Sequence, residues 1–264
     1  MIKTYHNSLV FASGKEGAGS GFIATLGNAN FLFTNAHVEA GITGVKFKSL
    51  DGTDLQAGEA SIAVGEDVFC MALQGNSKPF EIMQGVDANA SIGDAVVVLG
   101  NAEGGGVVNT IIGKIVGIGP NLVEIDAQFV PGNSGSPIIH IKTGKVIGVA
   151  TYSVTRKYNV TTNEKMRKPE IRRFGYRLDT VKKWQPVNWQ SFNAQASRMK
   201  DIEALTDDLY DFFVDLSENK NSVTAGWHTN PVIKTRIDQW VAGKSRRLSA
   251  SDAQLGGRQL PFVS

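Results

Sequence analysis

Short apolar runs separated by turn signals recur through the first 180 residues of the chain. Ala95 to Leu99 is apolar throughout and Val45 to Leu50 alternates; these patterns predict a buried and a half-buried strand. Gly27-Asn28 and Asp51-Gly52 are turn signals between such runs. We expect strands at residues 8–12, 22–26, 31–34, 45–50, 60–64, 68–73, 95–99, 109–118, 122–126, 138–141, 145–151 and 174–178. Their regular spacing predicts an all-β sandwich or barrel.

The pattern changes after about residue 153. Residues 156–177 hold eight basic residues and two acids, which predicts a solvated surface loop or, alternatively, a basic patch beside a substrate groove. Apolar residues then recur at helical spacing from Ser191 to Leu216 and again from Pro231 to Val241. We therefore expect a β domain over residues 1–180, a helical C-terminal extension over 181–247 and a flexible tail over 248–264.

Composition excludes several classes of site and partner. Twenty-seven basic and 25 acidic residues leave a net charge of +2, which calls for no nucleic-acid or membrane partner. Cys70 is the only cysteine and the four histidines lack metal-ligand spacing, so we expect no disulfide, metal or cofactor. The first residues contain no apolar h-region. We expect a cytoplasmic protein, or a periplasmic or secreted one if a leader has been removed.

One glycine-flanked serine is the strongest candidate for chemistry. It lies in Val130-Pro131-Gly132-Asn133-Ser134-Gly135-Ser136-Pro137, between two apolar runs. The simplest interpretation of the backbone is a strand, a tight turn and a second strand. The alternative to a catalytic serine is an ordinary hairpin turn without a chemical role. A serine at such a turn has an exposed hydroxyl, and the amides of Gly132 and Ser134 can point to one spot beside it, as in an oxyanion hole.

A serine nucleophile needs a base, and the base needs an orienting acid. His37 follows an apolar strand after small residues, and Asp67 opens the buried run that follows it. A carboxylate at the mouth of an apolar strand is costly unless it has a partner, and His37 can be that partner. Weaker rivals exist for the acid and for the base: Asp51, Asp54, His6 and His140.

Five motifs in order carry a family resemblance. They are Gly19-Ser-Gly-Phe-Ile, Phe33-Thr-Asn-Ala-His37-Val, Asp67 before its apolar run, Ser91-Ile-Gly-Asp-Ala-Val-Val-Val-Leu-Gly-Asn101, and Ile125-Asp-Ala-Gln-Phe-Val-Pro-Gly-Asn-Ser-Gly-Ser-Pro137. Together, over about residues 8–152, they resemble the protease domain of the HtrA (Deg) type among the chymotrypsin-like serine peptidases. The resemblance implies a mainly β fold with two six-stranded barrels and the active site between them. The helical C-terminal extension is not explained by it.

The resemblance also implies roles for individual residues. His37 resembles the general base, Asp67 its orienting acid and Ser134 the nucleophile. The amides of Gly132 and Ser134 resemble the oxyanion hole, with Asn133 shaping the turn. Ser136 departs from the usual second glycine, and we expect little effect from it. No PDZ-like pattern follows the domain.

For substrate recognition, the resemblance puts the residue six before the serine, Gln128, at the base of the primary pocket, next to Phe129. Asp126 is the nearby acid that leaves cleavage after basic residues open. Gly148, Val149, Ala150 and Thr151 would form one wall and pair with substrate as an added strand. We expect a small or medium aliphatic residue before the cut.

The sequence therefore predicts a serine endopeptidase that acts on proteins or peptides through an acyl-enzyme. The alternatives are a catalytically silent pseudo-protease that binds proteins, and a basic adaptor that binds nucleic acid through residues 156–177. A regulatory protein that docks on the C-terminal helices is a further expected partner.

Overall fold

A computed structural model describes residues 5–15, 17–42, 44–55, 57–73, 78–156 and 170–202. The chain divides into two units, Met1–Ala196 and Ser197–Ser264. The described strands all lie in the first unit, and residues 189–202 are helical. The predicted helix beyond residue 202, the helix over 231–241, the tail and the centre of the basic stretch lie outside the described residues.

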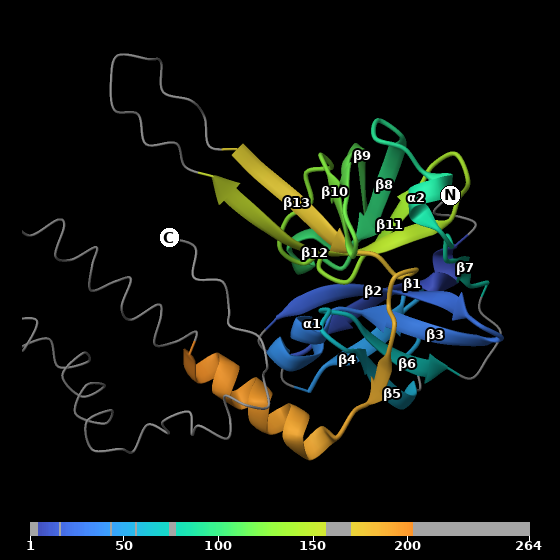
Figure 1. Cartoon of the computed structure of the whole chain (residues 1–264). Coiled ribbons are helices and arrows are strands. Elements are labelled where there is room, and N and C mark those ends of the chain that lie inside the picture. The colour runs from blue at the N-terminus through green and yellow to red at the C-terminus, as the bar shows by residue number, and fades with distance from the viewer. Residues whose placement is uncertain are drawn as a thin grey trace, which may run out of the picture. The chain divides into compact units, whose positions relative to one another are not determined.

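The first half of the Met1–Ala196 unit is an eight-stranded sheet (Figure 1). Its path is β14-β5-β6-β3-β2-β1-β4, with β7 parallel to β2. The strands are β1 (Leu9–Ser13), β2 (Ala18–Leu26), β3 (Ala29–Thr34), β4 (Lys46–Ser49), β5 (Ala57–Ala63), β6 (Phe69–Leu73), β7 (Phe80–Glu81) and β14 (Trp184–Pro186). In place of the expected first barrel of six strands, the structure has a sheet of eight strands, which β7 and β14 join and whose path does not close.

The second half is a closed barrel of six strands, in the order β10-β13-β12-β11-β8-β9. They are β8 (Ala95–Gly100), β9 (Asn109–Ile118), β10 (Leu122–Ile125), β11 (Pro137–His140), β12 (Val146–Arg156) and β13 (Glu170–Tyr176). The short helix η1 (His6–Ser8) precedes β1, and the short helices α1 (Ala36–Gly41), α2 (Val86–Asn89) and η2 (Ala102–Gly104) connect strands. The prediction of a mainly β, chymotrypsin-like fold with a helical segment after it is confirmed.

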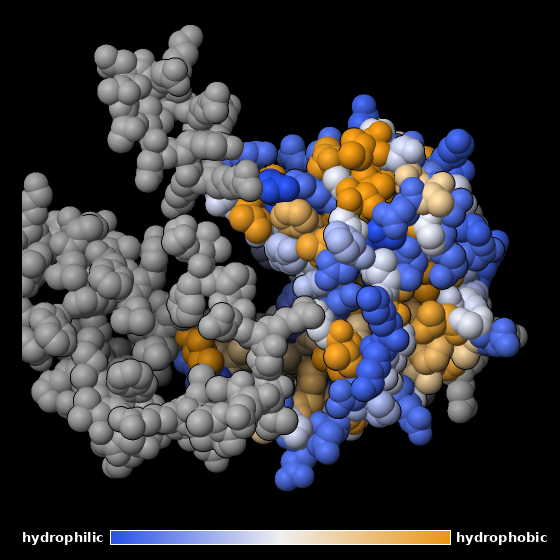
Figure 2. Space-filling view, in the orientation of Figure 1, coloured by the Kyte–Doolittle hydropathy of each residue, from blue (hydrophilic) through white to orange (hydrophobic). Residues whose placement is uncertain are grey.

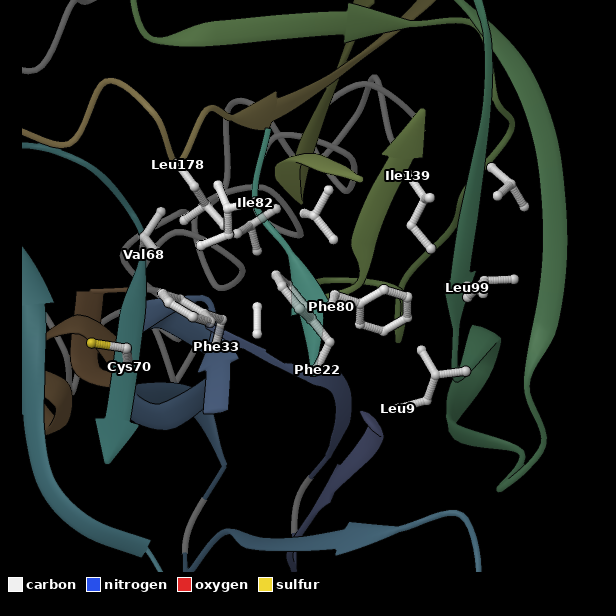
Figure 3. Close-up of a cluster of buried hydrophobic side chains, with 14 of the residues drawn as sticks. Leu9, Phe22, Phe33, Val68, Cys70, Phe80, Ile82, Leu99, Ile139 and Leu178 are labelled. Atoms are coloured by element: carbon white, nitrogen blue, oxygen red, sulfur yellow. The ribbon is translucent and has the colours of Figure 1, made fainter. Parts of the chain in front are cut away.

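The sheet and the barrel share one apolar cluster (Figure 3). Phe22, Phe33 and Phe80 enter it from the sheet, while Leu99 and Ile139 enter it from the barrel. All five side chains are almost fully buried, and burial of one such side chain stabilises the fold by about 1.5–3 kcal/mol. The cluster therefore fixes the two halves against each other, which is the condition for a site made from both.

The surface has a different composition from this core. The visible face of the described residues is mainly polar, with apolar patches over both the barrel and the sheet (Figure 2). Among the described residues, no helix is long and apolar enough to span a membrane.

Candidate active site

His37 lies in the first turn of α1, directly after β3 ends at Thr34. Asn35 is the residue before this short helix and keeps an extended backbone, with φ −86° and ψ 150°. Its side-chain Nδ2 donates a 2.7 Å hydrogen bond to the carbonyl oxygen of Asp67. The strand end predicted for His37 is thus a strand-to-helix turn, and Asn35 ties this turn to the segment that carries the candidate acid.

His37 and Asp67 form a close pair. The Nδ1 atom of His37 lies 2.6 Å from Oδ2 of Asp67, and the backbone N–H of His37 donates to Oδ1 at 3.0 Å. An ionised carboxylate only accepts hydrogen bonds, so Nδ1 must be the donor. A neutral imidazole then keeps an unprotonated Nε2. The His37 side chain is 50% exposed, which leaves this nitrogen accessible to a reacting group.

Thr151 connects this pair to Ser134. Its side-chain hydroxyl donates to Oδ2 of Asp67 at 2.8 Å, and its carbonyl oxygen accepts from the Ser134 hydroxyl at 3.3 Å. Within the described residues, no hydrogen bond joins Ser134 to His37. The structure therefore brings His37, Asp67 and Ser134 into one hydrogen-bonded chain, in which the serine hydroxyl is directed to Thr151.

The backbone around Ser134 forms two successive turns that depend on glycine. The N–H of Asn133 donates to the carbonyl of Val130, with Gly132 at φ +90°, and the N–H of Ser136 donates to the carbonyl of Asn133, with Gly135 at φ +88°. A positive φ at the third position is the pattern of a type II turn and favours glycine. The simple hairpin turn is therefore replaced by a double turn with Ser134 at its centre.

Strand β2 supports this double turn from the sheet side. The Ser20 N–H donates to the carbonyl of Ser134 at 2.9 Å, and the Ser20 hydroxyl donates to the carbonyl of Gly132 at 2.8 Å. A Cβ atom on Gly135 would lie 2.0 Å from the Ser20 carbonyl oxygen. Gly135 is thus needed for close approach as well as for its backbone angle.

The peptide between Pro131 and Gly132 is held by the loop after β8. Its carbonyl oxygen accepts a 2.8 Å hydrogen bond from the N–H of Glu103. Because C=O and N–H point in opposite directions in a trans peptide, the Gly132 N–H points away from Glu103. Neither this N–H nor that of Ser134 donates a hydrogen bond to another described residue. Two amide donors are therefore available beside the serine.

Asn133 and Ser136 are fully buried behind the turn. The Asn133 side chain donates to the carbonyl of Val130 at 3.2 Å, which ties it to the first of the two turns. A Cβ atom on Gly100 would lie 1.8 Å from the Ser136 hydroxyl oxygen. The hydroxyl that distinguishes Ser136 from glycine is accommodated because residue 100 has no side chain.

The residues expected to line the primary pocket differ in their exposure and in their strand pairing. Gln128 is exposed, whereas Phe129 is buried in the barrel core. Val149 pairs with both β11 and β13. The N–H of Ala150 donates to the carbonyl of Ser136, and the carbonyl of Ala150 accepts from the N–H of Gly135. Gly148 pairs with Ile138.

Val149 and Ala150 of β12 therefore have no free backbone edge for an added strand. The strand changes after Thr151, where Tyr152 to Thr155 are exposed and pair with β13 alone in the described part of the barrel.

The rival acids and bases have other partners. Asp51 accepts hydrogen bonds within its own turn, and Asp54 lies 3.6 Å from Lys48. His140 is 1% exposed, between the Thr143 hydroxyl and Asp94. The His6 side chain is outside the description. The described residues contain no group of three or more His, Cys, Asp or Glu side chains that could hold a metal.

Burial changes the acidity of two groups near the site. It raises the pKa of the Glu39 carboxyl, in the same helix as His37, to about 7. It lowers the pKa of the Arg173 guanidinium on β13. Desolvation disfavours the charged form in both cases.

Three residues of the site were not predicted in their observed roles. Thr151 was expected to line a pocket, and it also donates a hydrogen bond to Asp67. Glu103 orients a peptide bond. Arg173 was counted in the basic stretch 156–177, expected as a surface loop or as a basic patch beside a substrate groove, and it lies in β13. The glycine-rich sequence around Glu103 was a signal for an irregular loop, but no sequence pattern identifies the carbonyl that its N–H binds.

Comparisons with known proteins agree with this geometry. Residues 19–149 match the trypsin-like peptidase domain family. The putative serine protease HhoB of Synechocystis sp. is 32% identical over 150 residues, covering 52% of this chain and 35% of the relative. The probable periplasmic serine endoprotease DegP-like of Bartonella henselae is 33% identical over 140 residues, covering 50% and 27%. The chain thus spans about a third or less of the length of these relatives.

The solved structure of the HtrA-type protease AlgW with tripeptide has a TM-score of 0.50 and 19% identity, and the match covers 68% of this chain and 59% of that one. This likeness concerns the fold alone. Residues 19–149 therefore belong to a trypsin-like peptidase domain, and the resemblance to the HtrA type that the sequence motifs indicate is confirmed.

Proposed function

We propose that the chain is a serine endopeptidase in which Ser134 is the nucleophile, His37 the general base and Asp67 the acid that orients His37. The observation that carries this proposal is the hydrogen-bonded chain from His37 through Asp67 and Thr151 to Ser134. A serine hydroxyl becomes nucleophilic when a positioned base takes its proton, and Nε2 of His37 is the unprotonated nitrogen of this pair.

The reaction begins with rotation of the Ser134 hydroxyl from the Thr151 carbonyl towards His37. Ser134 Oγ attacks the peptide carbonyl carbon while Nε2 of His37 takes its proton. The amides of Gly132 and Ser134 bind the oxyanion, and loss of one such donor costs about 10²–10³ in kcat. His37 then protonates the leaving amine, and water hydrolyses the acyl-enzyme through the same steps in reverse.

Substrate would pair with β12 beyond Thr151. Tyr152 to Thr155 offer an exposed strand edge next to Ser134, and extended peptides bind such edges by adding a strand. This choice moves the expected substrate strand from residues 148–151 to residues 152–155. Phe129 and Gln128 remain proposed neighbours of the residue before the cut.

The alternative is a pseudo-protease that keeps the fold and binds proteins without cleaving them. A fluorophosphonate probe distinguishes the two, because it forms a covalent bond with an activated serine. We expect labelling of the wild type and of Ser91→Ala, an exposed serine outside the site, and no labelling of Ser134→Ala. If the folded wild-type protein is not labelled at neutral pH, the result would contradict the endopeptidase and favour the pseudo-protease.

Protein or peptide substrates are the partners that this function requires. The curated DegP-like relatives from Bartonella henselae and Rhizobium meliloti are named periplasmic, which supports the second of the two expected compartments. Fractionation of the producing cells tests this location. Regulatory docking on the C-terminal helices stays a prediction, since residues beyond 202 lie outside the description.

A further inference from the structure

Arg173 lies at the inner face of the barrel, next to the serine turn. In the sheet register it pairs with Ile125 on β10 and with Ser153 on β12, and directly paired residues of antiparallel strands share a face. Ile125 is 2% exposed and belongs to the barrel core. The Arg173 side chain therefore starts on the interior side, and its Nε–H donates to the carbonyl of Phe129 at 2.9 Å.

The neighbouring Arg172, in the same strand, differs from Arg173 because a carboxylate balances its charge. On the opposite face, Arg172 makes a bidentate pair with Glu124, with N···O distances of 2.6 and 2.5 Å, and lies over the Phe174 ring. Arg173 has no carboxylate partner among the described residues, and only its Nε is bonded. Its two terminal nitrogens keep donors in the fork geometry that matches a carboxylate.

The nearby acids of the barrel are already engaged. Asp126 accepts a 2.6 Å hydrogen bond from the backbone N–H of Lys114 on β9. In the sequence, this is the acid that kept cleavage after basic residues as an option. Glu124 is held by Arg172. A partly desolvated guanidinium without an acid partner is unfavourable by itself and favours an incoming anion.

We propose that Arg173 makes this peptidase select aspartate or glutamate immediately before the cleaved bond. The inference rests on the proposed function, because it assumes that the substrate residue enters beside Phe129 and the exposed end of β12. It replaces the sequence-based expectation of a small or medium aliphatic residue, which considered Gln128 and did not consider β13.

The test measures labelling of Ser134 by peptide phosphonates that differ only at the residue before the reactive centre. With the wild type, we expect the glutamate or aspartate probe to react about 10- to 100-fold faster than its glutamine or asparagine isostere, as for a hydrogen bond to a charged group. This comparison needs no variant and does not depend on how a mutant folds. Equal rates for the charged and neutral probes would overturn the acidic preference while leaving the peptidase intact.

Variants then assign the preference to Arg173. Arg173→Gln should remove the charge discrimination, Arg173→Lys should keep part of it, and the matched control Arg172→Gln should retain it. Discrimination that survives in Arg173→Gln would contradict the assignment. No labelling by any phosphonate or by the fluorophosphonate would overturn the proposed function together with this inference, so the two failures are distinguishable.

Discussion

The sheet and the barrel contribute to the candidate site in different ways. The sheet side supplies His37 and Asp67, which are held by side-chain hydrogen bonds and are 50% and 27% exposed. The barrel side supplies Ser134, which is held by backbone hydrogen bonds in a double turn with two positive φ angles. The acid–base pair is thus specified by side-chain chemistry and the nucleophile by backbone conformation, and substitutions can test each half separately.

Asp67→Asn tests the sheet half and should have the largest effect. Oδ1 of Asp67 accepts from the His37 backbone N–H, and Oδ2 accepts from His37 Nδ1 and from the Thr151 hydroxyl. The amide of asparagine has one acceptor oxygen and cannot serve both positions, so His37 loses its preferred tautomer. We expect kcat for peptide hydrolysis to fall by about 10⁴-fold with little change in fold. Steady-state hydrolysis and circular dichroism check this, with Asp54→Asn, an exposed acid paired to Lys48, as the control. A loss below tenfold would argue against the role of Asp67.

Gly132→Ala tests the barrel half. The new Cβ would lie 2.4 Å from the Asn101 carbonyl oxygen and 2.7 Å from the Glu103 N, which displaces the peptide that carries one oxyanion donor. We expect kcat to fall by about 10²–10³-fold.

Gly27→Ala is the matched control for this substitution. Gly27 also has a positive φ, +62°, but a Cβ there meets nothing within 4 Å. It should lower the free energy of unfolding by about 1–2 kcal/mol without changing kcat. Equal kcat for the two variants would mean that the Gly132 peptide has no catalytic role.

Thr151→Val tests the link between the halves and should have the smallest effect. It removes the hydroxyl that donates to Asp67 while keeping the carbonyl that accepts from Ser134. Loss of one hydrogen bond to a charged group corresponds to about 1.5–3 kcal/mol, so kcat/KM should fall about 10- to 100-fold. Thr110→Val, at an exposed position of β9, should have no effect. An unchanged kcat/KM for Thr151→Val would show that the backbone of β12 suffices to hold the two halves in register.

Much of the fold could be predicted from local pattern. Ala95 to Leu99 and Phe69 to Leu73 lie in strands, as their apolar runs indicate. The prediction was less accurate where strands find partners: β14 joins β5 at residues 61–63, which no local pattern encodes. His37 was expected at a strand end and lies in a helical turn, because the six-residue α1 has too little sequence for a clear period.

The sequence by itself determined which residue types could act as nucleophile, base and acid, and where glycine permits the turn around Ser134. These are local properties, since φ limits and hydroxyl or imidazole chemistry belong to single residues and their neighbours. Only the tertiary structure decided that Thr151 holds Asp67, that Glu103 orients the Pro131–Gly132 peptide and that Arg173 faces Phe129 with no acid partner among the described residues. Each of these contacts joins segments far apart in the chain. The Thr151–Asp67 contact exists only after the sheet and the barrel have packed on their common core, and the other two exist only after the strands of the barrel have come together.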